Sequence, residues 1–152
     1  TKQWPESRWV ELCDALEHEP GELRLVGGPG DASLLRRIAS STRHARTQVM
    51  TELTLLESAG LMAGAQWVLT NDSGPLHLAS AVDAPTVAVF CSTVPSFGFG
   101  PLASRSAVVE TELKLACRPC GLHGKTACPL GHFDCGQSIS AEAVLAAVRR
   151  LS

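Results

Sequence analysis

The chain has 152 residues, the length of a single domain, because domains usually run to roughly 100–200 residues. Its 13 Lys and Arg residues against 15 Asp and Glu give a formal net charge of -2, without the basic excess that a nucleic-acid-binding protein carries. With 45% hydrophobic and 18% charged residues, the composition excludes intrinsic disorder, and no apolar run approaches the roughly 20 residues of a membrane-spanning helix.

The first half of the chain alternates helix and strand patterns. Pro5 suits the first position of a helix, and apolar residues recur at helical spacing from Trp9 to Leu16 before Pro20 and Gly21 end the pattern. The elements expected next, in chain order, are a strand at 23–26, a helix carrying Leu34, Leu35 and Ile38, a weak strand at 48–50, and a helix behind a capping box of Thr54 and Glu57.

The second half continues this alternation and then becomes irregular. Residues 67–69 and 86–90 form short apolar runs typical of buried strands, and a helix is expected between them at 76–82. The elements expected after these are a strand at 107–109, a Cys-rich irregular segment at 117–135, and a final helix that Ser140 caps.

Strands that alternate with helices predict right-handed crossovers and a parallel sheet that is covered on both faces. The continuous apolar character of 67–69 and 86–90 supports this prediction, because strands buried on both sides show no polar alternation. We therefore expect an α/β domain, a Rossmann-like parallel sheet with helices on both faces. Because the chain starts at Thr1 without Met or a leader, and a helix pattern follows directly from Pro5, we also expect a fragment of a longer protein.

Ligands of open parallel sheets bind outside the carboxyl ends of the strands, close to helix N-termini. Asp72, Ser73 and Gly74 stand between a predicted strand end and a helix start, where free backbone N–H groups and the helix dipole favour a phosphate. His77 falls about one turn into that helix, within reach of the same anion. The loops expected at this edge of the sheet are 27–31, 71–77 and 91–101.

Each of these features also has a purely structural interpretation. Asp72 or Ser73 can simply cap the helix, with His77 packed on the sheet. The glycine turn at 27–30 lacks the full G-x-G-x-x-G fingerprint, so a tight turn explains it at least as well as a phosphate cradle does. Asp31 can accept hydrogen bonds from ribose hydroxyls or cap the second helix. Spacing alone leaves these alternatives open.

Several motifs occur in an order that is typical of one enzyme family. The sequence TNDSGPLHLA at 70–79 is followed by APTVAVF at 84–90 and by STVP at 92–95. Together with TKQWPE at 1–6 and the Cys-rich segment at 117–135, they resemble glycosyltransferase family 9, the lipopolysaccharide heptosyltransferases, and most of all its heptosyltransferase II members. The resemblance covers essentially the whole chain.

The resemblance implies a GT-B glycosyltransferase, in which two Rossmann-like domains face each other across a cleft. Residues 1–152 resemble the C-terminal, nucleotide-sugar-binding domain, with the N-terminal acceptor-binding domain absent from the chain. The implied reaction transfers heptose from ADP-heptose to the inner core of lipopolysaccharide with inversion and without a cofactor. The catalytic residue is unknown, because the resemblance places the general base on the absent domain.

Carried over by position, Lys2 takes the place of a donor-phosphate contact and Asp31 that of an acidic ribose contact. Lys2, His77 and the helix start at Gly74 would then stabilise the negative charge that builds on departing ADP, without a metal. Cys91 stands where the family usually has Gly, so we expect a different backbone path for the loop that carries Thr93. The implied donor-binding residues are Lys2, Asp31, Asp72, Ser73, Gly74, His77 and Thr93.

Four of the six cysteines lie within 117–135. Cys117 and Cys120 have the spacing of metal ligands, and in one interpretation Cys128 with Cys135 or His132 completes a tetrahedral zinc site. The second pair lacks the C-x-x-C spacing, so no metal is favoured over reduced or partly oxidised thiols. Stable disulfides are not expected in a reducing cytosol.

Two other functions stay open at this point. One is a stand-alone nucleotide-binding or regulatory module without catalysis, and the other is a nucleotide-sugar epimerase of the same two-domain architecture, which the DSGPLH run resembles less well. The expected partners are ADP-heptose or a similar nucleotide sugar, the N-terminal acceptor-binding domain and the lipopolysaccharide inner core, but no nucleic acid. We expect a cytoplasmic protein, with a peripheral position at the inner face of the inner membrane as the finer alternative.

Overall fold

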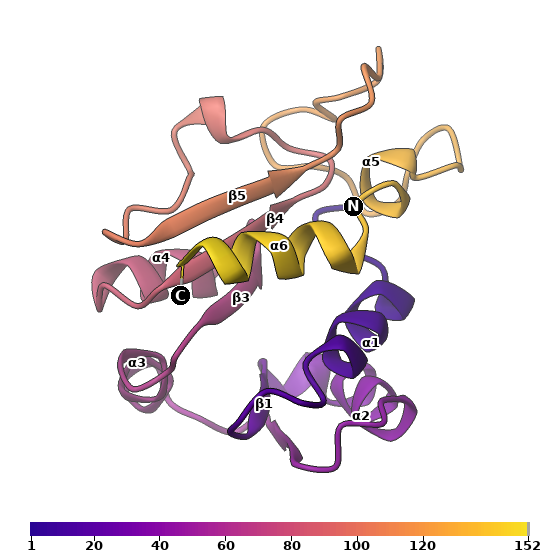
Figure 1. Cartoon of the computed structure of the whole chain (residues 1–152). Helices are drawn as coiled ribbons and strands as arrows, with labels where there is room; N and C mark the ends of the chain where they lie inside the picture. The colour runs from indigo at the N-terminus through magenta and orange to yellow at the C-terminus, as the bar shows by residue number, and fades with distance from the viewer. Residues whose placement is uncertain (152) are drawn as a thin grey trace.

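A computed structural model describes residues 1–151 of the chain (Figure 1). Helices and strands alternate up to β5, as the sequence predicts, and the predicted Cys-rich segment is largely irregular. The elements, in chain order, are α1 (Glu6–Ala15), β1 (Leu23–Val26), η1 (Pro29–Asp31), α2 (Ala32–Ser41), β2 (Thr47–Met50), α3 (Leu55–Ala63), β3 (Val68–Asn71), α4 (Gly74–Ala81), β4 (Thr86–Phe90), η2 (Pro95–Phe97), β5 (Ser106–Glu110), α5 (Asp134–Gln137) and α6 (Ala141–Leu151).

All strand pairs are parallel, but they form two sheets instead of one continuous sheet. β1 pairs with β2, and β3, β4 and β5 pair in that order, with Val68 opposite Thr86 and Thr86 opposite Ser106. Leu23 of β1 and Leu69 of β3 pack against the same hydrophobic core. Side-chain packing therefore joins the two sheets where the sequence predicted a continuous hydrogen-bonded ladder.

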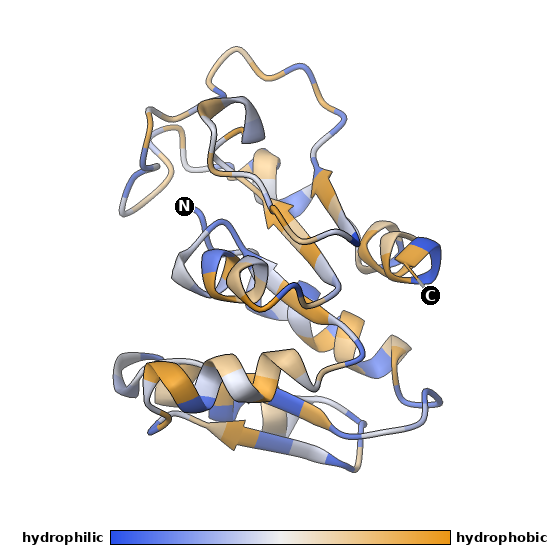
Figure 2. Ribbon diagram, turned by 90° about the vertical axis from the view of Figure 1, so that its left-hand side faces the viewer, coloured by the Kyte–Doolittle hydropathy of each residue, from blue (hydrophilic) through white to orange (hydrophobic). Residues whose placement is uncertain are grey.

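β4 is the central strand, and helices cover both of its faces. Val87 and Val89 lie in one core cluster with residues of α1 and α6, whereas Ala88 and Phe90 pack against Leu76 of α4. All five residues of β4 are buried, while β1 has an intermediate or exposed residue at every position. In Figure 2 the central strands are orange, and the lower strands are interrupted by blue. The predicted cover on both faces is confirmed for β4.

Capping confirms two of the predicted helix starts. The Thr54 hydroxyl accepts a hydrogen bond from the Glu57 backbone N–H at 3.2 Å, and the Glu57 carboxylate accepts one from the Thr54 N–H at 2.7 Å. Ser140 accepts from the N–H of Ala143 at 3.2 Å at the start of α6. No helix within residues 1–151 is long and apolar enough to cross a membrane.

The connection between β3 and α4 also differs from the sequence prediction. β3 ends at Asn71 and α4 begins at Gly74, so only two residues separate the strand from the helix, fewer than the predicted 67–69 strand and 76–82 helix leave. The polar side chain of His44 is buried, and the backbone carbonyl of this residue accepts a hydrogen bond from the Thr47 hydroxyl at 2.8 Å. The short connection matters most, because it places the start of α4 directly at the carboxyl end of the central sheet.

Candidate ligand-binding site at the ends of β3 and β4

The segment before α1 lies across the carboxyl end of β3. Trp4 is buried, and its indole N–H donates to the carbonyl of Ile139 at 3.1 Å. The Trp4 backbone N–H donates to the side-chain oxygen of Asn71, the last residue of β3, at 2.9 Å. These two bonds anchor the segment to the core and to the strand end, and they bring Lys2 to the same edge of the sheet.

Three segments that are far apart in the sequence meet at one carboxylate. Lys2 Nζ lies 2.8 Å from Asp72 Oδ2, and the Thr93 hydroxyl donates to the same oxygen at 2.6 Å. The Asp72 side chain is only 4% exposed, so these donors replace the water that a buried carboxylate loses. We call this group the Lys2–Asp72–Thr93 cluster.

The start of α4 lies beside the cluster and is open. Ser73 stands at the N-cap position, but its hydroxyl donates to the carbonyl of Asn71 at 3.3 Å, and no side chain among the described residues caps the helix. A Cβ added to Gly74 would meet none of the described atoms within 4 Å. Asp72 and Ser73 therefore do not act as helix caps, and no described side chain binds the backbone N–H groups at the helix start, a position that favours an anion.

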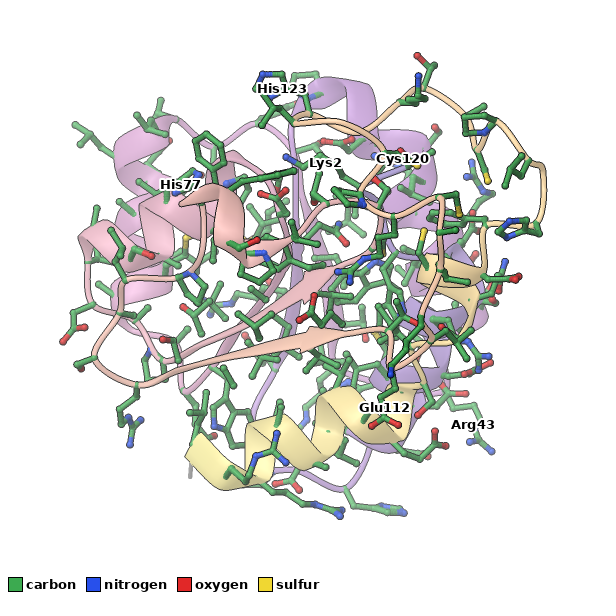
Figure 3. All side chains as sticks on the ribbon, turned by 90° about the horizontal axis from the view of Figure 1, so that it is seen from above. Lys2, Arg43, His77, Glu112, Cys120 and His123 are labelled. Atoms are coloured by element: carbon green, nitrogen blue, oxygen red, sulfur yellow. The ribbon has the colours of Figure 1, made fainter. Side chains whose placement is uncertain are left out.

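His77 lies on the exposed side of α4. Its ring contacts Phe99 edge to face, with 6.3 Å between the ring centroids and 69° between the planes. In the view of Figure 3, Lys2 lies between His77 and Cys120. The alternative in which His77 packs on the sheet is wrong, because the imidazole is accessible to a ligand.

The side-chain hydrogen bond of the glycine loop after β1 lies within the loop. The Asp31 carboxylate accepts from the Gly28 N–H at 3.0 Å, and a Cβ at Gly27 would lie only 2.9 Å from the Asp31 Cβ. Within residues 1–151, no hydrogen bond or ion pair joins this loop to Lys2, Asp72 or Thr93. Asp31 closes a tight turn, does not cap α2 with its side chain, and stands apart from the cluster.

The loop after β4 is held by a residue that the motifs did not single out. Cys91, which directly follows β4, is fully buried, and burial raises the pKa of its thiol to about 12. Arg118 donates to the carbonyls of Cys91 and Thr93, both at 2.7 Å. Sequence reasoning missed Arg118, because contacts with backbone carbonyls leave no pattern of partner residues. Its only signal is its place between Cys117 and Cys120.

Among the described residues, all six cysteines are free thiols, and no three His, Cys, Asp or Glu side chains gather in a way that would hold a metal ion. Hydrogen bonds from backbone N–H groups, that of Phe133 foremost, lower the pKa of Cys128, whereas burial raises that of Cys135. The zinc site at Cys117, Cys120, Cys128 and Cys135 stays an alternative that the sequence did not favour.

Comparisons with known proteins agree on one family. The family model described as glycosyltransferase family 9 (heptosyltransferase) matches residues 1–128. Lipopolysaccharide heptosyltransferase 1 of Pseudomonas aeruginosa is 34% identical over 121 residues, which cover 79% of this chain and 33% of that protein. The chain thus spans about a third of the length of the curated relatives that it matches.

Two solved structures resemble the chain along 99% of its length. The structure of E. coli ADP-heptose LPS heptosyltransferase II matches with a TM-score of 0.78 and 25% identity, over 42% of that protein. A glycosyl transferase of family 9 from Veillonella parvula matches with a TM-score of 0.79 and 25% identity, also over 42% of its length. The chain therefore has the fold of part of these enzymes, which confirms the predicted Rossmann-like half of a GT-B glycosyltransferase.

Proposed function

The chain belongs to glycosyltransferase family 9, and from this membership we propose that it is the donor-binding half of an inverting heptosyltransferase. In this proposal ADP-heptose, or a similar nucleotide sugar, binds where β3 and β4 end. The supporting observation is the Lys2–Asp72–Thr93 cluster beside the open start of α4. A domain outside residues 1–152 supplies the acceptor site and the general base. The proposed acceptor is the inner core of lipopolysaccharide, at the inner face of the inner membrane.

The cluster gives Lys2 and Asp72 different tasks. Asp72 is a buried anion, so a direct contact with a diphosphate would be repulsive. Its role in the proposal is to fix the ammonium group of Lys2, whose side chain is 30% exposed and so can reach a ligand. A cation held in place before the ligand arrives loses less entropy on binding than a free lysine side chain does.

Donor cleavage explains why this geometry suits the reaction. When the bond from the anomeric carbon to the phosphate oxygen breaks, negative charge develops on the departing ADP. In this proposal Lys2, which Asp72 holds, the N–H groups at the start of α4 and the exposed His77 imidazole donate hydrogen bonds to this charge. They act preferentially on the transition state, because the charge is larger there than in the bound donor. The acceptor hydroxyl attacks from the opposite side, which gives inversion.

Isothermal titration calorimetry with ADP and the full-length protein tests the proposal. We expect His77→Ala to weaken ADP binding by roughly three- to tenfold, the equivalent of one hydrogen bond. His18→Ala is the matched control, because His18 is exposed just beyond the end of α1. Unchanged affinity in His77→Ala would remove His77 from the site, and a wild-type protein that binds no ADP would refute the proposal.

A transfer assay separates the enzyme from a stand-alone nucleotide-binding module. We expect transfer of heptose from ADP-heptose to an inner-core acceptor, and loss of transfer in His77→Ala in proportion to the loss of affinity. ADP binding without transfer to any inner-core acceptor would favour the module. The epimerase alternative has no support in the family match.

A further inference from the structure

Arg118 links the Cys-rich segment to the end of the central strand. Its guanidinium donates to the carbonyl of Cys91 at 2.7 Å, to that of Thr93 at 2.7 Å and to that of Phe90 at 3.2 Å. It also lies 2.6 Å from a carboxylate oxygen of Glu110. The Arg118 side chain is only 11% exposed. These contacts account for a guanidinium that is almost fully removed from water.

The carbonyls bound by Arg118 lie where β4 ends and its loop turns away. A buried carbonyl beyond the last ladder hydrogen bond needs another donor, and Arg118 supplies it at Phe90, Cys91 and Thr93. Glu110 is the register partner of Phe90 on β5, so the same guanidinium ties the loop to the neighbouring strand. The path of the loop therefore depends on Arg118.

Thr93 connects this anchor to the candidate site. Its carbonyl accepts from Arg118, while its hydroxyl donates to the oxygen of Asp72 that also contacts Lys2. Arg118 thus contacts one member of the Lys2–Asp72–Thr93 cluster directly. A shift of the loop would move the Thr93 hydroxyl and free one side of the buried carboxylate.

A second contact of the Cys-rich segment reaches Lys2 directly. Gly124 adopts a φ of +70°, and an added Cβ there would lie 3.0 Å from Lys2 Cγ and 2.9 Å from the Ser92 hydroxyl oxygen. The Cys120 N–H donates to the carbonyl of Ser92 at 2.8 Å. The segment therefore lies against both the loop after β4 and the aliphatic stem of Lys2.

We propose that Arg118 is a positioning residue of the donor site, which holds the loop after β4 so that Thr93 and Asp72 keep Lys2 in place for a diphosphate. This inference rests on the proposed function, because it takes the diphosphate of the donor as the ligand. The Cys-rich segment then forms one side of the donor site, and Gly124 packs closely against the side chain of Lys2.

The test compares ADP with adenosine, which lacks the diphosphate. In Arg118→Ala we expect about a tenfold loss of ADP affinity, the equivalent of one charge-assisted hydrogen bond, with adenosine affinity unchanged. Arg118→Lys restores part of the loss, because an ammonium group can donate to some of the same carbonyls. Arg43→Ala is the matched control, because Arg43 pairs with Asp14 and lies far from Lys2 in Figure 3.

The outcomes separate this inference from the proposed function. A wild-type protein without ADP affinity overturns the proposed function, and the inference with it. Wild-type binding together with an Arg118→Ala variant that keeps its ADP affinity, or loses ADP and adenosine affinity equally, overturns the inference alone. If Arg118→Ala does not fold, Gly124→Ala replaces it, because the new Cβ displaces the stem of Lys2. We expect Gly124→Ala to lose ADP affinity and to keep its adenosine affinity. An ADP affinity equal to that of the wild-type protein would count against the inference.

Discussion

Two loops of this molecule share residue types but make different contacts. Both follow a parallel strand, both precede a helix, and both contain glycine and one aspartate: 27–31 after β1, and 71–74 after β3. Asp31 accepts a hydrogen bond from within its own loop, whereas Asp72 binds Lys2 and Thr93 from distant segments. A turn with glycine and aspartate after a strand therefore does not by itself gather side chains from distant segments, and the ribose contact of Asp31 stays a prediction. What distinguishes the second loop is the segments that meet there.

The position of each strand explains the difference. β3 lies beside the fully buried β4, with Asn71 opposite Val89, so the loop after β4 comes up next to Asp72. β1 pairs only with β2 among the described strands, and the backbone of Gly27 donates to Met50 at the end of β2. The loop after β1 thus meets a neighbouring strand through its backbone, and the loop after β3 meets a neighbouring loop through side chains.

We expect the largest loss of stability when Asp72, the residue that binds distant donors, is replaced. Asp72→Ala leaves the Thr93 hydroxyl without its acceptor and Lys2 without its partner, so the free energy of unfolding should fall by about 2 kcal/mol. Lys2 keeps some access to water, which limits the loss. Urea denaturation measures the change, and a loss no greater than that in Asp31→Ala would mean that the two loops are energetically equivalent.

We expect an intermediate loss of stability when Gly27, in the loop after β1, is replaced by alanine. Gly27→Ala places a Cβ 2.9 Å from the Asp31 Cβ and 3.0 Å from a Leu35 methyl carbon, but the turn at 28–30 is exposed and can shift, so we expect a loss of about 1 kcal/mol in stability. Gly74→Ala and the control Gly30→Ala meet none of the described atoms within 4 Å and should leave stability unchanged or slightly raised. Thermal unfolding of the three variants checks this order, and a destabilised Gly74→Ala would show that the start of α4 is not open.

The smallest effect is expected at Asp31. Asp31→Ala removes the acceptor for the Gly28 N–H, but that N–H belongs to an exposed turn and can bind water instead. We therefore expect a loss of about 0.5 kcal/mol in the free energy of unfolding. The same urea experiment measures it, with Asp31→Asn as the variant that keeps an acceptor. A loss above that of Asp72→Ala would reverse the comparison of the two loops.

Much of the fold was predictable from local patterns. The capping box of Thr54 and Glu57 and the apolar run 86–90 each predict their element, because the interactions that define them lie within a few residues. Boundaries were harder: α4 begins at Gly74, with Pro75 in its first turn, two residues before the predicted start at Leu76. The burial of His44 was not predicted, because the exposure of one polar residue depends on segments packed against it.

The order of the elements and the family follow from the amino-acid sequence, because local periodicity, turn residues and the DSGPLH run are all contiguous. The tertiary structure alone decided which aspartate gathers distant donors and that Arg118 holds the loop carrying Thr93. Thr93 is 21 residues from Asp72, and Arg118 is 25 residues from Thr93. Contacts across such separations follow from strand order and packing in the folded state, and no local pattern encodes them.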